Sequence, residues 1–293
     1  MALTSPALMV AVPALFGAIR PTLDTLRRIG ATDFSADAPE YDVKPGATIK
    51  IPISSVSAAS AYNDSTNNYL TGGSTDWATL VCTHYLRGYD VSGVNVDQGV
   101  DAAKMKQLFA VRAGKSIAAA AMANAKTALD GVTASTAVKL PALASAGISD
   151  YQTLGSGLDW LDRANSALAL NAAEYAHVKA VFAAANVIGT ERELAEFIGF
   201  RDLVCVPGLT ARAVIVPDGS VGFLGRVPTI VADYPEYGVE VDDESGFAVG
   251  IVRANDQTHN RIVVNADVWF GTSVLSAPAG ATTAGAVNVG TAS

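Results

Sequence analysis

The sequence contains 293 residues, of which 50% are hydrophobic and 16% are charged. Ordinary globular domains carry a charge on roughly 25% of their residues. The chain therefore either buries much of its surface against copies of itself or is simply rich in alanine. The net charge of −8 and the pI of about 4.8 exclude a protein that binds nucleic acid over its whole surface, because phosphate contacts need clustered Lys and Arg.

The N-terminal segment does not fit an export signal or a membrane span. Residues 7–19 are apolar, but no Lys or Arg precedes them and Pro13 interrupts them. A signal peptide needs a basic start, and a membrane helix needs about 20 apolar residues. We therefore expect the protein to be made and retained in the cytoplasm. The two cysteines, Cys82 and Cys205, lie in strand-like runs and are expected to be small buried hydrophobes.

The first predicted elements are a helix and a strand. Residues 14–28 form an amphipathic pattern that predicts a helix, which Gly30 can end. Its apolar side consists of Leu15, Ile19, Leu23 and Leu26. We expect this segment to be an arm that lies on another surface. Isoleucines then alternate with other residues over 49–53, after a Pro-Gly turn, and predict a strand.

A long polar loop and a long helix follow. Residues 54–75 are almost all small and polar, and strands are predicted after them at 78–88 and 89–96. A loop of this length has too little core to stand alone, so it must be flexible or lean on a partner. Residues 97–130 then predict a helix of about 45–50 Å, ended by Gly131. The apolar stripe of this predicted helix consists of Met105, Leu108, Phe109, Ile117, Met122 and Leu129. Its basic residues lie mostly outside that stripe and are Lys104, Lys106, Arg112, Lys115 and Lys126.

The second half of the chain predicts an α+β unit and then a β meander. Helices are predicted at 158–168, after Asn171 and after Thr190, the last two because a capping residue is followed by Glu three positions later. Strands are predicted at 203–206 and 212–216, with a hairpin turn at 217–219. The strands of the meander are predicted at 238–241, 247–254 and 261–270. The uncharged tail at 276–293 is expected to be irregular or disordered.

Tests for catalytic and metal-binding motifs fail. Residues 113–116 read Ala-Gly-Lys-Ser, but a phosphate loop needs Gly where Phe109 stands, and it needs a preceding strand. Residues 155–157 lack the spacing of a nucleophile elbow. The acidic residues 242–244 lack the spacing of a calcium loop and predict a solvated turn. The histidines, which are predicted to be structural, are His84, His177 and His259. No catalytic, cofactor-binding or metal-ligating residue is predicted.

The order of the predicted elements resembles that of the major capsid proteins of tailed phages, the Hong Kong 97-like fold. Four stretches carry this resemblance, namely Pro45-Gly46, residues 168–175, residues 197–206 with 213–224, and residues 261–278. The fold class that it implies is α+β, with an N-arm, an E-loop, a P domain with a spine helix, and an A domain. The implied segments are the N-arm 1–42, the E-loop with its strands 43–96, the spine helix 97–131, the A domain 132–230, the closing strands 231–278 and the tail 279–293.

The resemblance implies a self-assembling structural subunit that needs no cofactor. Hexamers and pentamers would form an icosahedral shell around double-stranded DNA bound without sequence specificity, with portal and scaffolding proteins as further partners and no membrane. The implied contacts between subunits are Tyr62, Asn67, Tyr69 and Trp77 of the E-loop segment and Leu15, Ile19 and Leu23 of the arm. Residues 54–80 contain no Lys or Arg, so the clamping should be noncovalent rather than through a Lys–Asn link. Alternatives are an encapsulin-like nanocompartment shell, a hydrolase with a nonlocal site, and a β-rich phage tail or adhesin protein.

Overall fold

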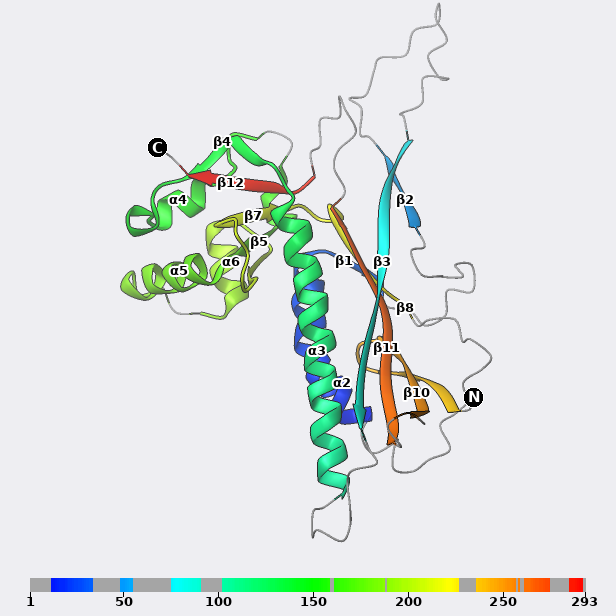
Figure 1. The fold of residues 1–293 in the computed structure, drawn as a ribbon. Helices are drawn as coiled ribbons and strands as arrows, with labels where there is room; N and C mark the ends of the chain where they lie inside the picture. The colour runs from blue at the N-terminus through cyan, green and yellow to red at the C-terminus, as the bar shows by residue number, and fades with distance from the viewer. Residues whose placement is uncertain are drawn as a thin grey trace, which may run out of the picture.

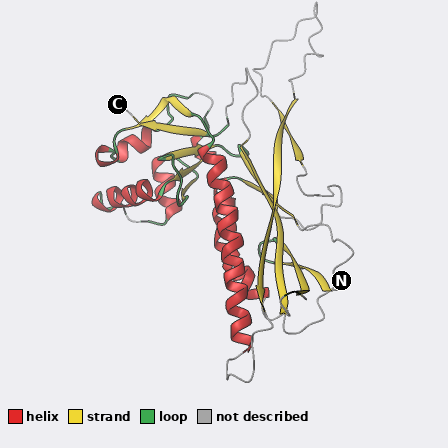
Figure 2. Cartoon of the chain, in the orientation of Figure 1, coloured by secondary structure: helices red, strands yellow, loops and turns green. Residues whose placement is uncertain are grey.

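The structure is a computed structural model in which two β-sheets flank two helices that lie side by side (Figure 1, Figure 2). The predicted α+β class is confirmed. The described residues are 12–33, 48–54, 75–90, 102–158, 161–187, 189–226, 236–256, 258, 261–274 and 285–291.

The two helices are α2 (Val12–Ile29) and α3 (Ala102–Asp130), and they pack along each other (Figure 1). Helix α3 has 29 residues, which gives a length of about 43 Å at 1.5 Å per residue. It ends at Gly131, whose backbone N–H donates to the carbonyl oxygen of Thr127 at 3.1 Å. The predicted long helix and its end are therefore confirmed.

The larger sheet is built around one long strand. Its described strands follow the order β1 (Ala31–Asp33), β8 (Val221–Arg226), β11 (Arg261–Val274), β10 (Ala248–Asp256) and β9 (Glu236–Val241), with β3 (Thr75–Asp90) on β11 and β2 (Thr48–Ser54) on β3. Strand β11 pairs antiparallel with β3 along one edge, and with β10 and then β8 along the other. The β9–β10–β11 meander and the strand β2 confirm the predictions for those segments.

The smaller sheet is covered on both faces. Its order is β4 (Ala134–Leu140), β12 (Val287–Thr291), β7 (Ala213–Val216), β5 (Ala167–Leu170) and β6 (Asp202–Cys205). One face packs against α4 (Ile148–Thr153), α5 (Ala172–Ala184) and α6 (Glu191–Ile198). In β5, Leu168 and Leu170 face those helices, whereas Ala167 and Ala169 join the core that contains α2 and α3.

The helix starts of this unit follow the predicted capping signals. The side chain of Asn171 accepts a hydrogen bond from the backbone N–H of Glu174 at 2.8 Å, which begins α5. Thr190 and Glu193 form the reciprocal capping box that begins α6. Gly199 ends α6 with a φ of 84°, a left-handed conformation that glycine adopts without strain.

Two predicted elements are wrong, the first of them because a short apolar run does not distinguish a helix from a buried strand. The helix predicted at 158–168 is instead the 3-10 helix η4 (Arg163–Asn165) followed by the first residues of β5. The strands predicted separately at 78–88 and 89–96 are one strand, β3, as far as Asp90. Residues 91–96 lie outside the described residues.

Two further predictions fail because they depend on contacts between distant parts of the chain. The turn at 217–219 exists, since Ser220 N donates to the Pro217 oxygen at 3.1 Å. It is not a hairpin, because β7 belongs to the smaller sheet and β8 to the larger one. The tail is not irregular throughout, because β12 pairs parallel with β4 and antiparallel with β7.

The buried side of α3 is lined mainly by small residues rather than by the predicted large ones. Its buried residues are Ala110, Ala113, Gly114, Ile117, Ala118, Ala121, Ala125 and Leu129. Leu108 of the predicted stripe is 43% exposed. A Cβ added at Gly114 would lie 2.5 Å from the carbonyl oxygen of Leu15. The glycine of the Ala-Gly-Lys-Ser stretch is therefore explained by the close approach of α2 to α3.

Replacing Gly114 with Ala is expected to destabilise the subunit, because the added methyl group has no room against α2. Extra atoms in a packed contact cost about 1–3 kcal/mol, and the gain from Ala over Gly in a helix is at most ~1 kcal/mol. The matched control is Gly17→Ala in α2, where an added Cβ meets nothing within 4 Å. Urea unfolding should show lower stability for Gly114→Ala and a small gain for Gly17→Ala. Similar gains for both would contradict the close contact.

Candidate functional site

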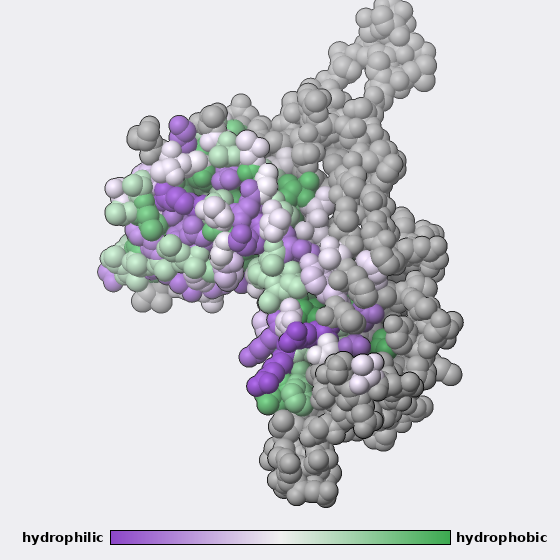
Figure 3. All heavy atoms as spheres, in the orientation of Figure 1, coloured by the Kyte–Doolittle hydropathy of each residue, from purple (hydrophilic) through white to green (hydrophobic). Residues whose placement is uncertain are grey.

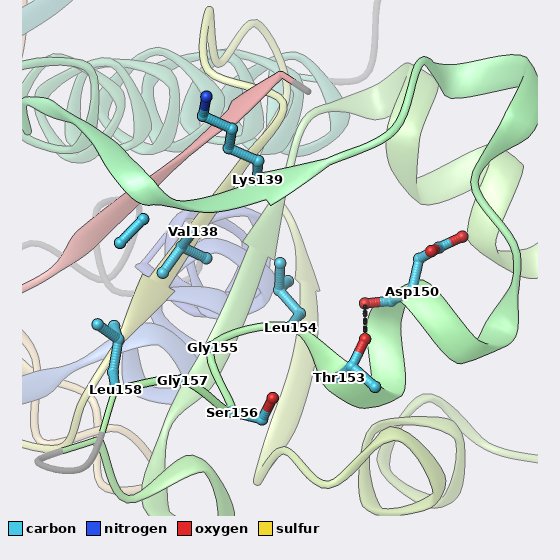
Figure 4. A pocket seen from close by; sticks show the side chains of 10 residues that line it. Val138, Lys139, Asp150, Thr153, Leu154, Gly155, Ser156, Gly157 and Leu158 are labelled. Atoms are coloured by element: carbon cyan, nitrogen blue, oxygen red, sulfur yellow. Dashed lines mark hydrogen bonds between the residues drawn. The ribbon is translucent and has the colours of Figure 1, made fainter. Parts of the chain in front are cut away.

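A pocket among the described residues does not have the arrangement of a catalytic site. It has a volume of about 330 Å³ and lies between β4, α4 and the turn 154–158 (Figure 4). Its Asp150 carboxylate accepts a hydrogen bond from Gly147 N at 2.7 Å and so caps α4. Figure 4 shows Lys139 on the far side of the pocket from Ser156. Neither Asp150 nor Lys139 is placed to activate the Ser156 hydroxyl as a nucleophile.

The other sequence candidates for chemistry are also structural where they are described. His177 lies on α5, and its Nε2 is 2.8 Å from the carbonyl oxygen of Ala146. Cys205 is a free, half-buried thiol, and burial raises its pKa. His84 lies in β3, and His259 lies outside the described residues. In the described ranges, no three His, Cys, Asp or Glu side chains gather to hold a metal.

Among the residues that the structure describes, no helix is both long enough and apolar enough to cross a bilayer.

The hairpin of β2 and β3 is the first candidate surface for assembly. Residues 48–54 of β2 pair antiparallel with residues 75–81 of β3. Strand β11 pairs with β3 only over residues 81–90. In the described part of the sheet, residues 75–80 therefore have β2 as their only neighbouring strand, and Figure 1 shows this end extending away from the helices.

An isolated two-stranded ribbon is marginally stable in water and leaves backbone groups unpaired at its edges. Pro52 lies in the middle of β2, opposite Trp77, and proline is confined to edge strands because it has no N–H to donate. This end of the hairpin therefore suits contact with another molecule. Of the predicted contact residues, Trp77 lies in this strand pair, whereas Tyr62, Asn67 and Tyr69 lie outside the described residues.

The predicted contact residues of the arm require a correction. Leu15, Ile19 and Leu23 are only 2%, 1% and 1% exposed, and they pack in the core formed with α3 and the two sheets. Side chains buried within their own chain leave no surface for a neighbouring subunit. Residues 12–33 are therefore part of the body of the subunit, not an arm that lies on another surface.

The charged side of α2 binds the turn between β9 and β10. Arg20 Nε donates to Asp242 Oδ2 at 3.0 Å, and Arg20 also pairs with Glu244. Arg27 donates to the carbonyl oxygen of Ser245. Asp242 is only 4% exposed, so the acidic turn is not simply solvated as predicted. The hydrogen bond from Arg20 is the main cause that lowers the pKa of Asp242.

The end of α2 binds the smaller sheet. Arg28 donates to both carboxylate oxygens of Asp202 at 2.7 Å and to Glu191 at 2.8 Å. Burial alone would raise the pKa of Glu191, but hydrogen bonds from Tyr175 and Arg28 outweigh burial and lower it. Helix α2 therefore connects the β9–β10 turn of the larger sheet with strand β6 and helix α6. These two elements belong to the smaller unit, which consists of the smaller sheet and the helices α4, α5 and α6.

The smaller unit contains a buried ion pair of its own. Glu174 is 1% exposed, and Arg212 donates to its two oxygens at 2.8 and 3.0 Å. Tyr151 donates to Glu174 at 2.5 Å, and its pKa is raised by burial and by this carboxylate. Removing one partner of a buried pair is costly, so this cluster holds α4, α5 and β7 in one arrangement. The geometry is that of a rigid scaffold.

Comparison by sequence gives no match, but comparison by fold does. No protein-family model matches the chain, and no curated protein matches it. The capsid of Ralstonia phage GP4 aligns with a TM-score of 0.53 at 8% identity, over 88% of each chain. The capsid of an empty GTA particle aligns with a TM-score of 0.57 at 14% identity, over 92% of this chain and 90% of the other. A virus-like particle from Pyrococcus furiosus aligns with a TM-score of 0.50 at 10% identity, over 90% of this chain and 93% of the other.

At such low identity the likeness defines the fold, and it covers most of the chain. The chain has the Hong Kong 97-like fold of phage major capsid proteins, so the resemblance predicted from the sequence is confirmed. The solved structures that share this fold are capsids.

The acid sensitivity of the subunit should depend on the contact between Arg20 and Asp242. Because the pKa of Asp242 is lowered in the folded state, its contribution is fully present above its unfolded pKa of about 3.9. That contribution is lost as the pH falls through the lower folded value. We therefore expect Asp242→Asn to destabilise the subunit at pH 6, and the difference from wild type to shrink as the pH falls from 5 to 2.

Urea unfolding at several pH values measures this difference. The control is Asp218→Asn, which removes an ion-paired carboxylate whose side chain is 70% exposed and should change stability by less than about 1 kcal/mol. A difference between Asp242→Asn and wild type that is independent of pH would show that the Arg20 contact does not stabilise the charged carboxylate.

Proposed function

We propose that this chain is a major capsid protein that assembles with many copies of itself into an icosahedral shell. The observation that supports this most strongly is the extent of the likeness, because about nine-tenths of both chains align with the capsid of the empty GTA particle. In finer detail, we propose hexamers and pentamers formed by heterologous contacts between neighbours, in a phage head that is assembled in the bacterial cytoplasm and encloses double-stranded DNA.

The β2–β3 hairpin and the residues between its strands are proposed as the E-loop that clamps a neighbouring subunit. Support comes from residues 75–80, which extend beyond β11 and are backed only by β2 in the described sheet. Tyr62, Asn67, Tyr69 and Trp77 would contribute the contacts, with the aromatic rings burying most of the area. The clamp would be noncovalent, because residues 54–80 contain no Lys or Arg.

Weak clamps suffice for a stable shell because each subunit makes several of them at once. Once one contact has formed, the next forms within the same assembly and gains from a high effective concentration. The rigid parts described above would keep each hairpin at the angle that this requires. A portal protein and a scaffolding protein are the further partners that we propose.

A second candidate function is the shell of a protein nanocompartment of the encapsulin type. The fold likeness to the virus-like particle from Pyrococcus furiosus favours keeping this candidate. Nuclease-protected DNA in purified shells would support the phage head, and a protein cargo would support the compartment. The described residues offer no observation in favour of the hydrolase alternative.

Deleting residues 57–74 is expected to leave a folded subunit that no longer forms shells, because the clamp loses most of its contact surface. The double substitution Tyr62→Ser with Tyr69→Ser should weaken assembly in the same direction by removing the two rings. The measurements are negative-stain electron microscopy for shells, and circular dichroism with a thermal melt for the folded subunit.

The matched control is Ser60→Ala with Ser65→Ala, which changes two positions in the same segment without removing ring area. This control should form shells as wild type does. Intact shells from the deletion variant would overturn the clamp, and a wild-type chain that stays monomeric under all assembly conditions would overturn the capsid function itself.

A further inference from the structure

Helix α3 is strongly basic, although the chain as a whole is acidic. Between Ala102 and Leu129 the helix sequence contains no Asp or Glu, and Asp130 is its single acidic residue. Its five basic residues are Lys104, Lys106, Arg112, Lys115 and Lys126. The whole chain has a net charge of −8, so this helix, with five basic residues and one acidic one, is opposite in charge to the chain as a whole.

Arg112 and Lys115 are exposed on the side of α3 that does not pack against α2. Neither side chain has an acidic partner within the described residues. Lys126 differs, because it pairs with Asp130 at 2.8 Å. The arginines of α2 also differ, since Arg20 and Arg28 both pair with carboxylates. Figure 3 shows hydrophilic side chains gathered where α3 faces the viewer.

The surroundings of these two cations do not resemble the centre of a protein–protein interface. The other exposed positions of this face are Leu108, Ser116, Ala119, Ala123 and Thr127. The centres of protein interfaces are rich in aromatic residues and poor in Lys, and this face has no exposed aromatic residue and a single large apolar one. Small and polar residues around Lys and Arg are the pattern that suits contact with a phosphate backbone.

We propose that the exposed face of α3, centred on Arg112 and Lys115, lines the inner wall of the shell and contacts the phosphates of the enclosed double-stranded DNA. This inference rests on the proposed capsid function. The two cations lie three positions apart and therefore share one side of the helix. Each subunit contributes few contacts, and a shell sums them over many copies. These contacts would not depend on the base sequence of the DNA, because backbone phosphates carry no sequence information.

The test measures binding of full-length, unassembled subunits to a linear duplex of about 50 base pairs, by fluorescence anisotropy over a range of salt concentrations. Each phosphate contact adds about 0.9 to the slope of log affinity against log salt. The double variant Arg112→Gln with Lys115→Gln should therefore lower this slope by about 1.8. The matched control is Lys179→Gln with Arg192→Gln, which removes two exposed cations from the smaller unit.

The control should keep the wild-type slope, and both variants should form shells and melt like wild type. An unchanged slope in the Arg112 and Lys115 variant would overturn the inference, as would an equal loss in the control. Normal DNA binding combined with a loss of shells would also overturn it, because the partner of α3 would then be a neighbouring subunit. The absence of wild-type shells would instead remove the proposed function, and with it the inner-wall role.

Discussion

The close packing of α2 against α3 is the contact on which the rest of the subunit depends. It requires small residues on α3, and at Gly114 it leaves no room even for a methyl group. Large residues on α2, among them Leu15, Ile19 and Leu23, fill the space that the alanines of α3 leave. With its apolar side fixed in this way, α2 presents Arg20 to one sheet and Arg28 to the other. One helix therefore sets the positions of both sheets.

A subunit held by these contacts has little freedom to change internally. Its interactions with other molecules therefore depend on the surfaces that these contacts do not use. The smaller sheet is buried on both faces, and the Glu174–Arg212 pair fixes its helices. Two regions of the described chain lack comparable support, namely residues 75–80 of the hairpin and the basic face of α3. A shell needs one surface that contacts neighbours and another that faces its contents. We infer that these two regions meet those two needs.

Sequence patterns predicted the features that depend on nearby residues and missed those that depend on distant ones. The caps at Asn171 and Thr190 and the meander of β9 to β11 follow local signals, and all are confirmed. The strand β12 was missed because its small uncharged residues become a strand only when β4 and β7 lie beside them. The amphipathic pattern of α2 showed that one side is covered, but it could not show that the cover is the chain's own core.

The distribution of charge could not be predicted from the composition either. A net charge of −8 argues against a general nucleic-acid binder, yet an average over the chain conceals how the charges are distributed. The acidic residues Asp202, Glu191 and Asp242 are largely used in pairing with the arginines of α2. On α3, by contrast, Arg112 and Lys115 have no such partners among the described residues. An acidic protein can therefore present a basic face, because internal ion pairs use its carboxylates while two cations of one helix stay exposed.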